Sequence, residues 1–167
     1  MLKDHAKLMA MLLHAGEIVG RKKLQKMVYI AKKVEMPFSE RYKFHMYGPY
    51  SEELTLRVEE LCNLGFVTEL KEDKGNYYQY RYSLSEEGKK FLELHEADVL
   101  EGKRIIEQMN EQSSRFLELV STLLYFEDLS PEEVKEKVKT LKPKQNYTDE
   151  DIEEASSFIK RIRMDIN

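Results

Sequence analysis

The sequence predicts a mainly helical α+β protein, and three observations lead to this fold class. Apolar residues recur at intervals of three and four over most of the 167 residues, which is the spacing of one helix face. The segments that alternate clearly between apolar and polar residues, 41–47 and 66–84, are short. Hydrophobic residues make up 41% of the chain and charged residues 35%, which suits a folded, helix-rich protein with a charged surface.

The first half of the chain contains three predicted helices. Residues 2–14 and 21–35 each gather apolar side chains on one face, and Pro37 ends the second helix. A third helix is expected to begin at Ser51, whose hydroxyl can cap the first turn. Gly65 is expected to follow its last turn, because glycine readily adopts the left-handed conformation found there.

The β-structure is predicted to lie around the third helix. Residues 41–47 form a short extended segment, and Gly48 with Pro49 is typical of a turn. After the third helix, 66–70 and 77–84 both alternate, and a glycine-containing linker joins them. These two segments therefore predict a β-hairpin.

The second half of the chain is predicted to be helical. The pattern runs from 86 to 126, and we expect a break near Gly102 or 110–114. Ser130 opens a further helix with a capping box, and Thr148 opens the last one.

The predicted order of elements is similar to that of a winged-helix domain, in which the hairpin is the wing. We therefore predict a winged-helix-like domain over residues 1–95 and a helical extension over residues 96–167. The apolar seam of 86–126 allows two roles for the extension. It packs on the first domain, or it forms the interface of a homodimer.

Two short motifs and a closing segment carry a family resemblance. KLQK at 23–26 is followed by Tyr29, and YGPY occupies 47–50. With segment 125–144, these motifs resemble the YwgA-type bacterial proteins and, more distantly, the Panacea antitoxin domain. The resemblance to Panacea implies a non-catalytic domain that neutralises a protein partner such as a toxin.

We expect the residues of these motifs to form an aromatic-lined groove that engages a toxin or a regulatory protein. Tyrosine offers a large contact area at a small entropic cost. In the alternative interpretation, Gly48 and Pro49 only turn the chain, and the tyrosines only fill the space between strand and helices. The predicted partner-binding residues are Tyr29, His45, Tyr47, Gly48, Pro49 and Tyr50.

A DNA-binding transcriptional regulator of the winged-helix type is the alternative function. The net charge of −4 and the carboxylates of the third helix disfavour it, because a duplex requires positive charge. Those carboxylates belong to Glu52, Glu53, Glu59 and Glu60. The residues that could contact nucleic acid are Arg21, Lys22, Lys23, Lys26, Lys74 and Arg81. In the opposing interpretation, the basic residues of the second helix form a solvated charged face.

The sequence predicts no enzyme, no catalytic residue, no metal and no cofactor. Its four histidines do not form ligand pairs, and its few glycines do not form a phosphate-binding loop. There is no apolar run of about 18 residues, so we expect no membrane span. The lone Cys62 excludes an intramolecular disulfide and favours a cytoplasmic location.

Overall fold

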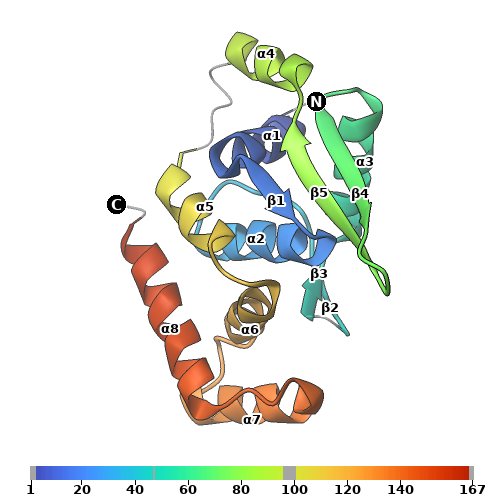
Figure 1. Cartoon of the computed structure of the whole chain (residues 1–167). Helices are drawn as coiled ribbons and strands as arrows, with labels where there is room; N and C mark the ends of the chain where they lie inside the picture. Colours follow the sequence, from blue (N-terminus) through green and yellow to red (C-terminus); the bar gives the residue numbers. More distant parts are fainter. Residues whose placement is uncertain (1–2, 47, 96–100, 166–167) are drawn as a thin grey trace.

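The computed structural model describes residues 3–46, 48–95 and 101–165, and it confirms the α+β class (Figure 1). The first half contributes helices α1 (Lys3–Ala15), α2 (Arg21–Lys33) and α3 (Glu52–Asn63). The second half contributes α4 (Glu86–Leu94), α5 (Lys103–Asn110), α6 (Ser114–Tyr125), α7 (Pro131–Leu141), the short helix η2 (Pro143–Gln145) and α8 (Asp149–Met164). Within the described ranges, no helix is both long and apolar enough to cross a membrane.

The larger sheet has three antiparallel strands in the order β1-β5-β4. Strands β4 (Val67–Asp73) and β5 (Tyr78–Leu84) form the predicted hairpin, with Val67 opposite Leu84. Strand β1 (Glu17–Val19) was not predicted. Its three residues are too short for an alternating pattern, and the strand is defined by its pairing with β5.

The smaller sheet is a hairpin of β2 (Lys43–His45) and β3 (Gly48–Tyr50). The predicted turn at Gly48 and Pro49 is wrong, because both residues belong to a strand, with Pro49 opposite Phe44. Proline is tolerated here because each strand of a two-stranded sheet is an edge strand, which does not need every backbone donor.

The helical run over 86–126 is broken as expected. Helix α5 starts after Gly102, and α6 starts after Ser113, whose Oγ accepts a hydrogen bond from the N–H of Phe116 at 3.1 Å. Helix α5 packs against α1 and α2, and α6 packs against α2 and α8. The seam residues Ile106, Met109 and Val120 are buried in the core of the same chain.

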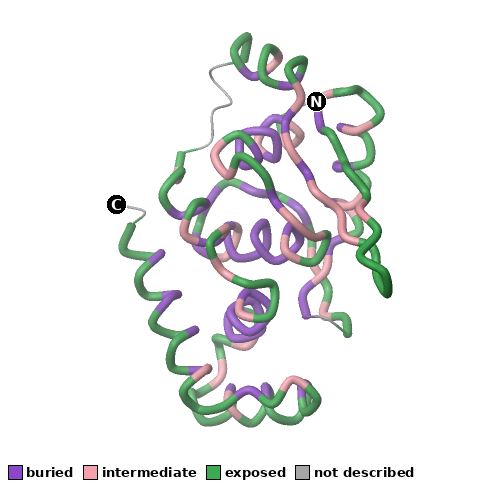
Figure 2. The backbone as a smooth tube through the Cα atoms, viewed as in Figure 1, coloured by how far each residue is buried: buried purple, intermediate pink, exposed green. Residues whose placement is uncertain are grey.

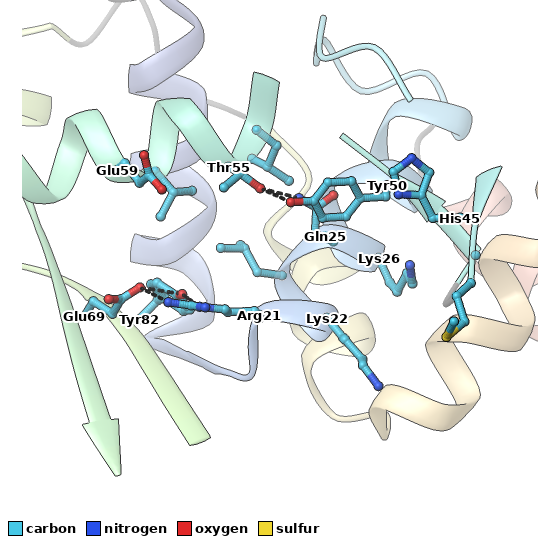
Figure 3. A pocket seen from close by; sticks show the side chains of 15 residues that line it. Arg21, Lys22, Gln25, Lys26, His45, Tyr50, Thr55, Glu59, Glu69 and Tyr82 are labelled. Carbon is cyan, nitrogen blue, oxygen red and sulfur yellow. Dashed lines mark hydrogen bonds and ion pairs between the residues drawn. The ribbon is translucent and has the colours of Figure 1, made fainter. Parts of the chain in front are cut away.

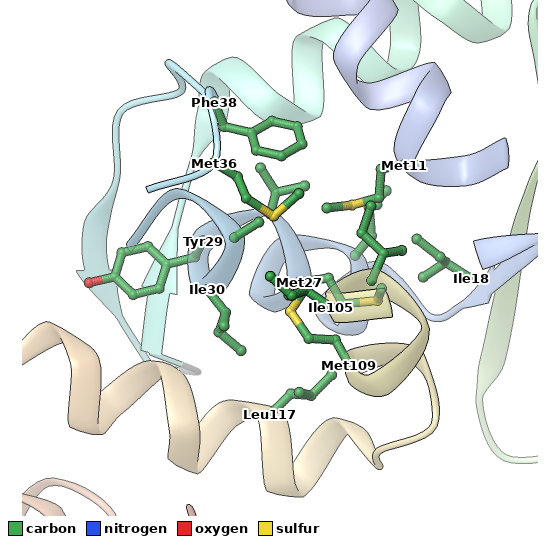
Figure 4. Packing of buried hydrophobic residues seen from close by; sticks show 14 of the residues in the cluster. Met11, Ile18, Met27, Tyr29, Ile30, Met36, Phe38, Ile105, Met109 and Leu117 are labelled. Carbon is green, nitrogen blue, oxygen red and sulfur yellow. The ribbon is translucent and has the colours of Figure 1, made fainter. Parts of the chain in front are cut away.

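Helix α2 lies at the centre of the molecule and is buried over most of its length (Figure 2). Met27 and Ile30 of α2 are fully buried. Figure 4 shows them among side chains from other helices, including Met11 of α1 and Ile105 of α5. The central helix therefore joins the two halves of the chain through one apolar cluster.

Gly88 sets the distance between α4 and the end of the hairpin. A Cβ atom at this position would lie 2.3 Å from the carbonyl oxygen of Phe66 and 2.7 Å from Cδ1 of Leu84. That carbonyl oxygen cannot move freely, because it accepts a hydrogen bond from the N–H of Ser85 at 3.0 Å. The helix therefore packs directly on backbone at this point.

We predict that Gly88→Ala lowers the free energy of unfolding by about 2 kcal/mol. At a solvent-exposed helix position, the same change would raise the free energy of unfolding by up to about 1 kcal/mol. A loss of stability therefore indicates that Gly88 packs against the backbone of Phe66. Urea denaturation measures it, with Glu87→Ala on the exposed side of α4 as the control. A stabilised Gly88→Ala variant would contradict the packing of α4 on Phe66.

Candidate binding groove

A groove lies between α2, α3 and the two hairpins (Figure 3). Its volume is about 670 Å³, which is within the range of sites that hold small molecules or single side chains of a partner. Its lining comes from Arg21, Lys22, Leu24, Gln25 and Lys26 of α2, from Leu54, Thr55, Val58 and Glu59 of α3, from His45, Met46, Gly48 and Tyr50 around the first hairpin, and from Glu69 and Tyr82 of the second.

The floor of the groove is apolar. Leu24, Leu54 and Val58 line it and are otherwise buried in the core. At the rim, the side chain of Met46 is 80% exposed. The ring of Tyr50 stacks on His45 with ring centroids 5.0 Å apart and planes 24° apart. An apolar group that enters the groove would therefore meet both aliphatic and aromatic surface.

Gln25 fixes the end of α3 that borders the groove. Its Oε1 accepts the N–H of Ser51 at 2.9 Å, and its Nε2 donates to the carbonyl of Ser51 at 2.9 Å. Nε2 also donates to Oγ1 of Thr55 at 3.1 Å, and that hydroxyl lies 2.9 Å from the hydroxyl of Tyr50. The amide side chain offers a separate donor and acceptor, which match the carbonyl and the N–H of one backbone residue. This explains why the KLQK motif has glutamine there.

Lys26 is buried at the bottom of the groove, on the side of the β2–β3 hairpin, and 2% of its surface is exposed. Its Nζ donates to the carbonyl of Pro49 at 2.8 Å. Burial is the main cause that lowers the pKa of Lys26 from its ordinary value of 10.5 to about 8. The carboxylate of Glu118 opposes this shift, whereas the ammonium groups of Lys142 and Lys22 add to it.

A second buried lysine holds the same hairpin. Nζ of Lys142 donates to the carbonyl of Met46 and lies 3.6 Å from Oε2 of Glu118. Gly48 follows with a φ of +91°, which favours glycine, and a Cβ there would lie 3.6 Å from Nζ of Lys26. The hairpin therefore contacts two ammonium groups, and its positive φ at position 48 would strain any residue other than glycine.

The wall on the β4–β5 side carries carboxylates. Oε2 of Glu69 accepts the hydroxyl hydrogen of Tyr82 at 2.6 Å and lies 3.8 Å from Nη2 of Arg21. The guanidinium of Arg21 also stacks over the ring of Tyr80, 3.7 Å from its centroid. Glu59 of α3 is exposed on the same side. The groove thus has basic groups along α2 and acidic groups on α3 and β4.

The structure brings together three of the six predicted partner-binding residues. His45, Gly48 and Tyr50 line the groove, and Pro49 is buried behind them with its carbonyl bonded to Lys26. Tyr29 points away from the groove and packs edge-on against Tyr42, with ring centroids 4.9 Å apart. Tyr47 lies outside the described residues.

The residues predicted to contact nucleic acid are dispersed. Arg21, Lys22 and Lys26 line the groove. Lys23 donates to the carbonyl of Asn110 at 2.5 Å, at the end of α5. On the β4–β5 hairpin, Lys74 lies 3.9 Å from Glu72, and Arg81 makes ion pairs of 2.6 Å with Glu72 and with Glu17.

The prediction of a solvated basic face on the second helix is wrong for Lys26. Position 26 is turned into the molecule beside the first hairpin, and its ammonium group bonds to backbone instead of water. The sequence does not distinguish Lys26 from the exposed lysines of the same helix, because its burial depends on a hairpin more than 20 residues away in the chain.

The groove contains the parts of a recognition site. It has an apolar floor, tyrosine surface and charged groups of both signs on its walls. Among the described residues, no three histidine, cysteine or acidic side chains gather in a way that could hold a metal ion. The arrangement can therefore bind an apolar group that is flanked by charge.

We predict that one lysine titrates near pH 8 in the NMR spectrum of the lysine side chains, and that its signal is absent from Lys26→Met. Lys22→Met removes a neighbouring positive charge and should shift this titration upward. Since the unfolded chain keeps this proton up to about pH 10.5, the contribution of Lys26 to stability rises between pH 8 and 10.5. A spectrum in which every lysine titrates above pH 10 would contradict the buried ammonium.

Comparisons with known proteins identify the relationship of this chain. No family model matches it. The chain is 60% identical over 163 residues to the uncharacterized protein YwgA of Bacillus subtilis (strain 168), and the match covers 98% of each sequence. Identity at this level over almost the whole length shows common family membership, and the chain belongs to the YwgA family of bacterial proteins.

Proposed function

We propose that this protein is a non-catalytic binding module of the winged-helix type, and that its groove holds a segment of a protein partner. The partner is a toxin or a regulatory protein, in keeping with the resemblance to the Panacea antitoxin domain. The observation that carries the proposal is the apolar groove between α2 and α3, which has tyrosines and opposite charges on its walls.

The order of the elements supports the winged-helix assignment. Helix α1, strand β1, helices α2 and α3 and the β4–β5 hairpin follow one another as in winged-helix domains. The central position of β5 between β1 and β4 is typical of the same arrangement. The β2–β3 hairpin is inserted between α2 and α3, and it supplies one rim of the groove.

The charges on α3 favour a protein partner over DNA. Glu52, Glu59 and Glu60 are exposed on this helix. Its one arginine, Arg57, is not available to phosphates, because it forms ion pairs with Glu40, with Asp4 at 3.3 Å and with Glu53 at 3.7 Å. A helix with this surface would repel the phosphates of a duplex.

We predict that Tyr50→Ala abolishes the capture of a protein partner by the tagged full-length chain from a nuclease-treated lysate of the native organism. Removal of a tyrosine from the centre of an interface typically weakens binding about 30-fold. The matched control is Tyr78→Ala, which removes an exposed tyrosine of the wing hairpin. The proposal fails if both variants retain the same proteins as the unchanged chain.

We also predict that the protein shows no saturable binding to a random-sequence DNA duplex at an ionic strength of about 0.15 M. Fluorescence anisotropy of a labelled duplex measures this. Binding that weakens steeply with salt and is lost in Lys22→Glu would instead favour the regulator, which is the alternative function.

A further inference from the structure

The buried charges beside the groove do not balance. Lys26 and Lys142 are both buried, with 2% and 6% of their surfaces exposed, and the carboxylate near them belongs to Glu118. Within the part of the chain that the structure describes, two ammonium groups therefore share one buried carboxylate. Since an uncompensated charge is costly in the interior, this end of the groove is suited to an additional negative charge.

The ammonium group of Lys26 makes fewer hydrogen bonds than it has donors. An ammonium group has three N–H donors, and within the described part of the chain Nζ of Lys26 makes one hydrogen bond, to the carbonyl of Pro49. Lys26 lines the groove, with Lys22 one turn earlier on α2 and His45 on the facing hairpin. Figure 3 shows the three side chains along the same side of the groove.

The opposite side of the groove has the opposite sign. Glu59 is exposed on α3, and Glu69 is held by Tyr82 and Arg21. A polyanion such as nucleic acid would place phosphates against both walls. A peptide can present one carboxylate to α2 and keep neutral or basic residues against α3 and β4, so the charge pattern favours a peptide.

We propose that the α2 side of the groove is a carboxylate-binding site, and that the partner segment carries an aspartate or glutamate next to the apolar side chain that enters the groove. The carboxylate accepts a charge-assisted hydrogen bond from the exposed Lys22, and the buried ammonium group of Lys26 adds a favourable potential. The apolar side chain lies on Leu24, Leu54 and Val58. This inference rests on the proposed function and specifies the chemistry of the partner.

The mixed charge of the groove also favours one order of charges along the bound segment. A carboxylate at the α2 wall places the residues beyond the apolar anchor near Glu59. A lysine or arginine at that end would meet a favourable potential, whereas a second carboxylate would be repelled. The preferred segment therefore has an acidic side, an apolar centre and a neutral or basic side.

The test is a selection of phage-displayed random peptides on the immobilised full-length chain. We expect the enriched peptides to share an acidic residue beside a large apolar residue. In a synthetic peptide from this set, replacement of the acid by its amide should weaken binding by about ten-fold or more. Isothermal titration calorimetry gives the dissociation constants.

Charge reversal in the protein provides the matched comparison. Lys22→Glu should weaken the binding of the same peptide by about ten-fold or more. Lys71→Glu makes the same change in net charge at an exposed position of β4, and it should leave the dissociation constant unchanged. Circular dichroism of both variants checks that they remain folded. Lys22 is used in place of Lys26 because its side chain lies at the surface.

The outcomes separate this inference from the proposed function. The enriched peptides could require Tyr50 for binding but lack a shared acidic residue and bind Lys22→Glu normally. That result would overturn the proposed carboxylate site and leave the proposed binding module standing. If no enriched peptide is weakened by Tyr50→Ala, the groove does not bind protein segments, and both proposals fail.

Discussion

The ammonium group of Lys26 links the groove to the core of the molecule. It projects from the central helix, reaches the carbonyl of Pro49 and lies within the field of Glu118 on α6. Removing an ammonium group from water costs several kcal/mol, and the hydrogen bond and the neighbouring carboxylate offset only part of that cost. The apolar packing of α2 against α5 and α6 must supply the rest. The geometry of the first hairpin therefore depends on a costly buried charge.

Next to Lys26, the uncharged side chain of Gln25 holds the start of α3. Gln25 and Ser51 exchange two hydrogen bonds, so the start of α3 is positioned by α2 and not by the loop that precedes it. Residues 25 and 26 are adjacent, and they hold the two ends of one segment, the first hairpin and the N-terminus of α3. The KLQK motif thus contacts the YGPY motif and the residue that follows it, through Lys26 with Pro49 and Gln25 with Ser51.

Much of the fold could be predicted because its signals are local. Ser51, Ser130 and Thr148 accept the capping hydrogen bonds expected at the starts of α3, α7 and α8. The β4–β5 hairpin follows from alternation around a glycine-containing turn. Strand β1 and the pairing of Gly48–Tyr50 with β2 were missed, because three-residue strands are created by their partners and leave no period in the sequence.

The candidate site could be predicted only in part. The YGPY motif indicated the region of the groove, and two of its residues, Gly48 and Tyr50, line it. The local sequence does not indicate that Lys26 and Lys142 are buried, since each lies in a segment rich in charged residues. Glu40, which is fully buried and pairs with Arg57, is a similar case. Glu118 differs, because it is the one charged residue in the apolar stretch 116–126, and that pattern could have indicated its burial. The burial of a charged side chain depends on which segments meet it in space, and that information is tertiary.

The contact of Lys142 with the carbonyl of Met46 joins positions 96 residues apart in the chain. The rim of the groove is made by the first third of the protein, but one of its two supports comes from the end of α7. During synthesis, the elements from α1 to β5 leave the ribosome before this support exists. The finished shape of the rim is therefore reached only after translation has passed Lys142, and a shortened chain that ends before α7 would lack this contact with the hairpin.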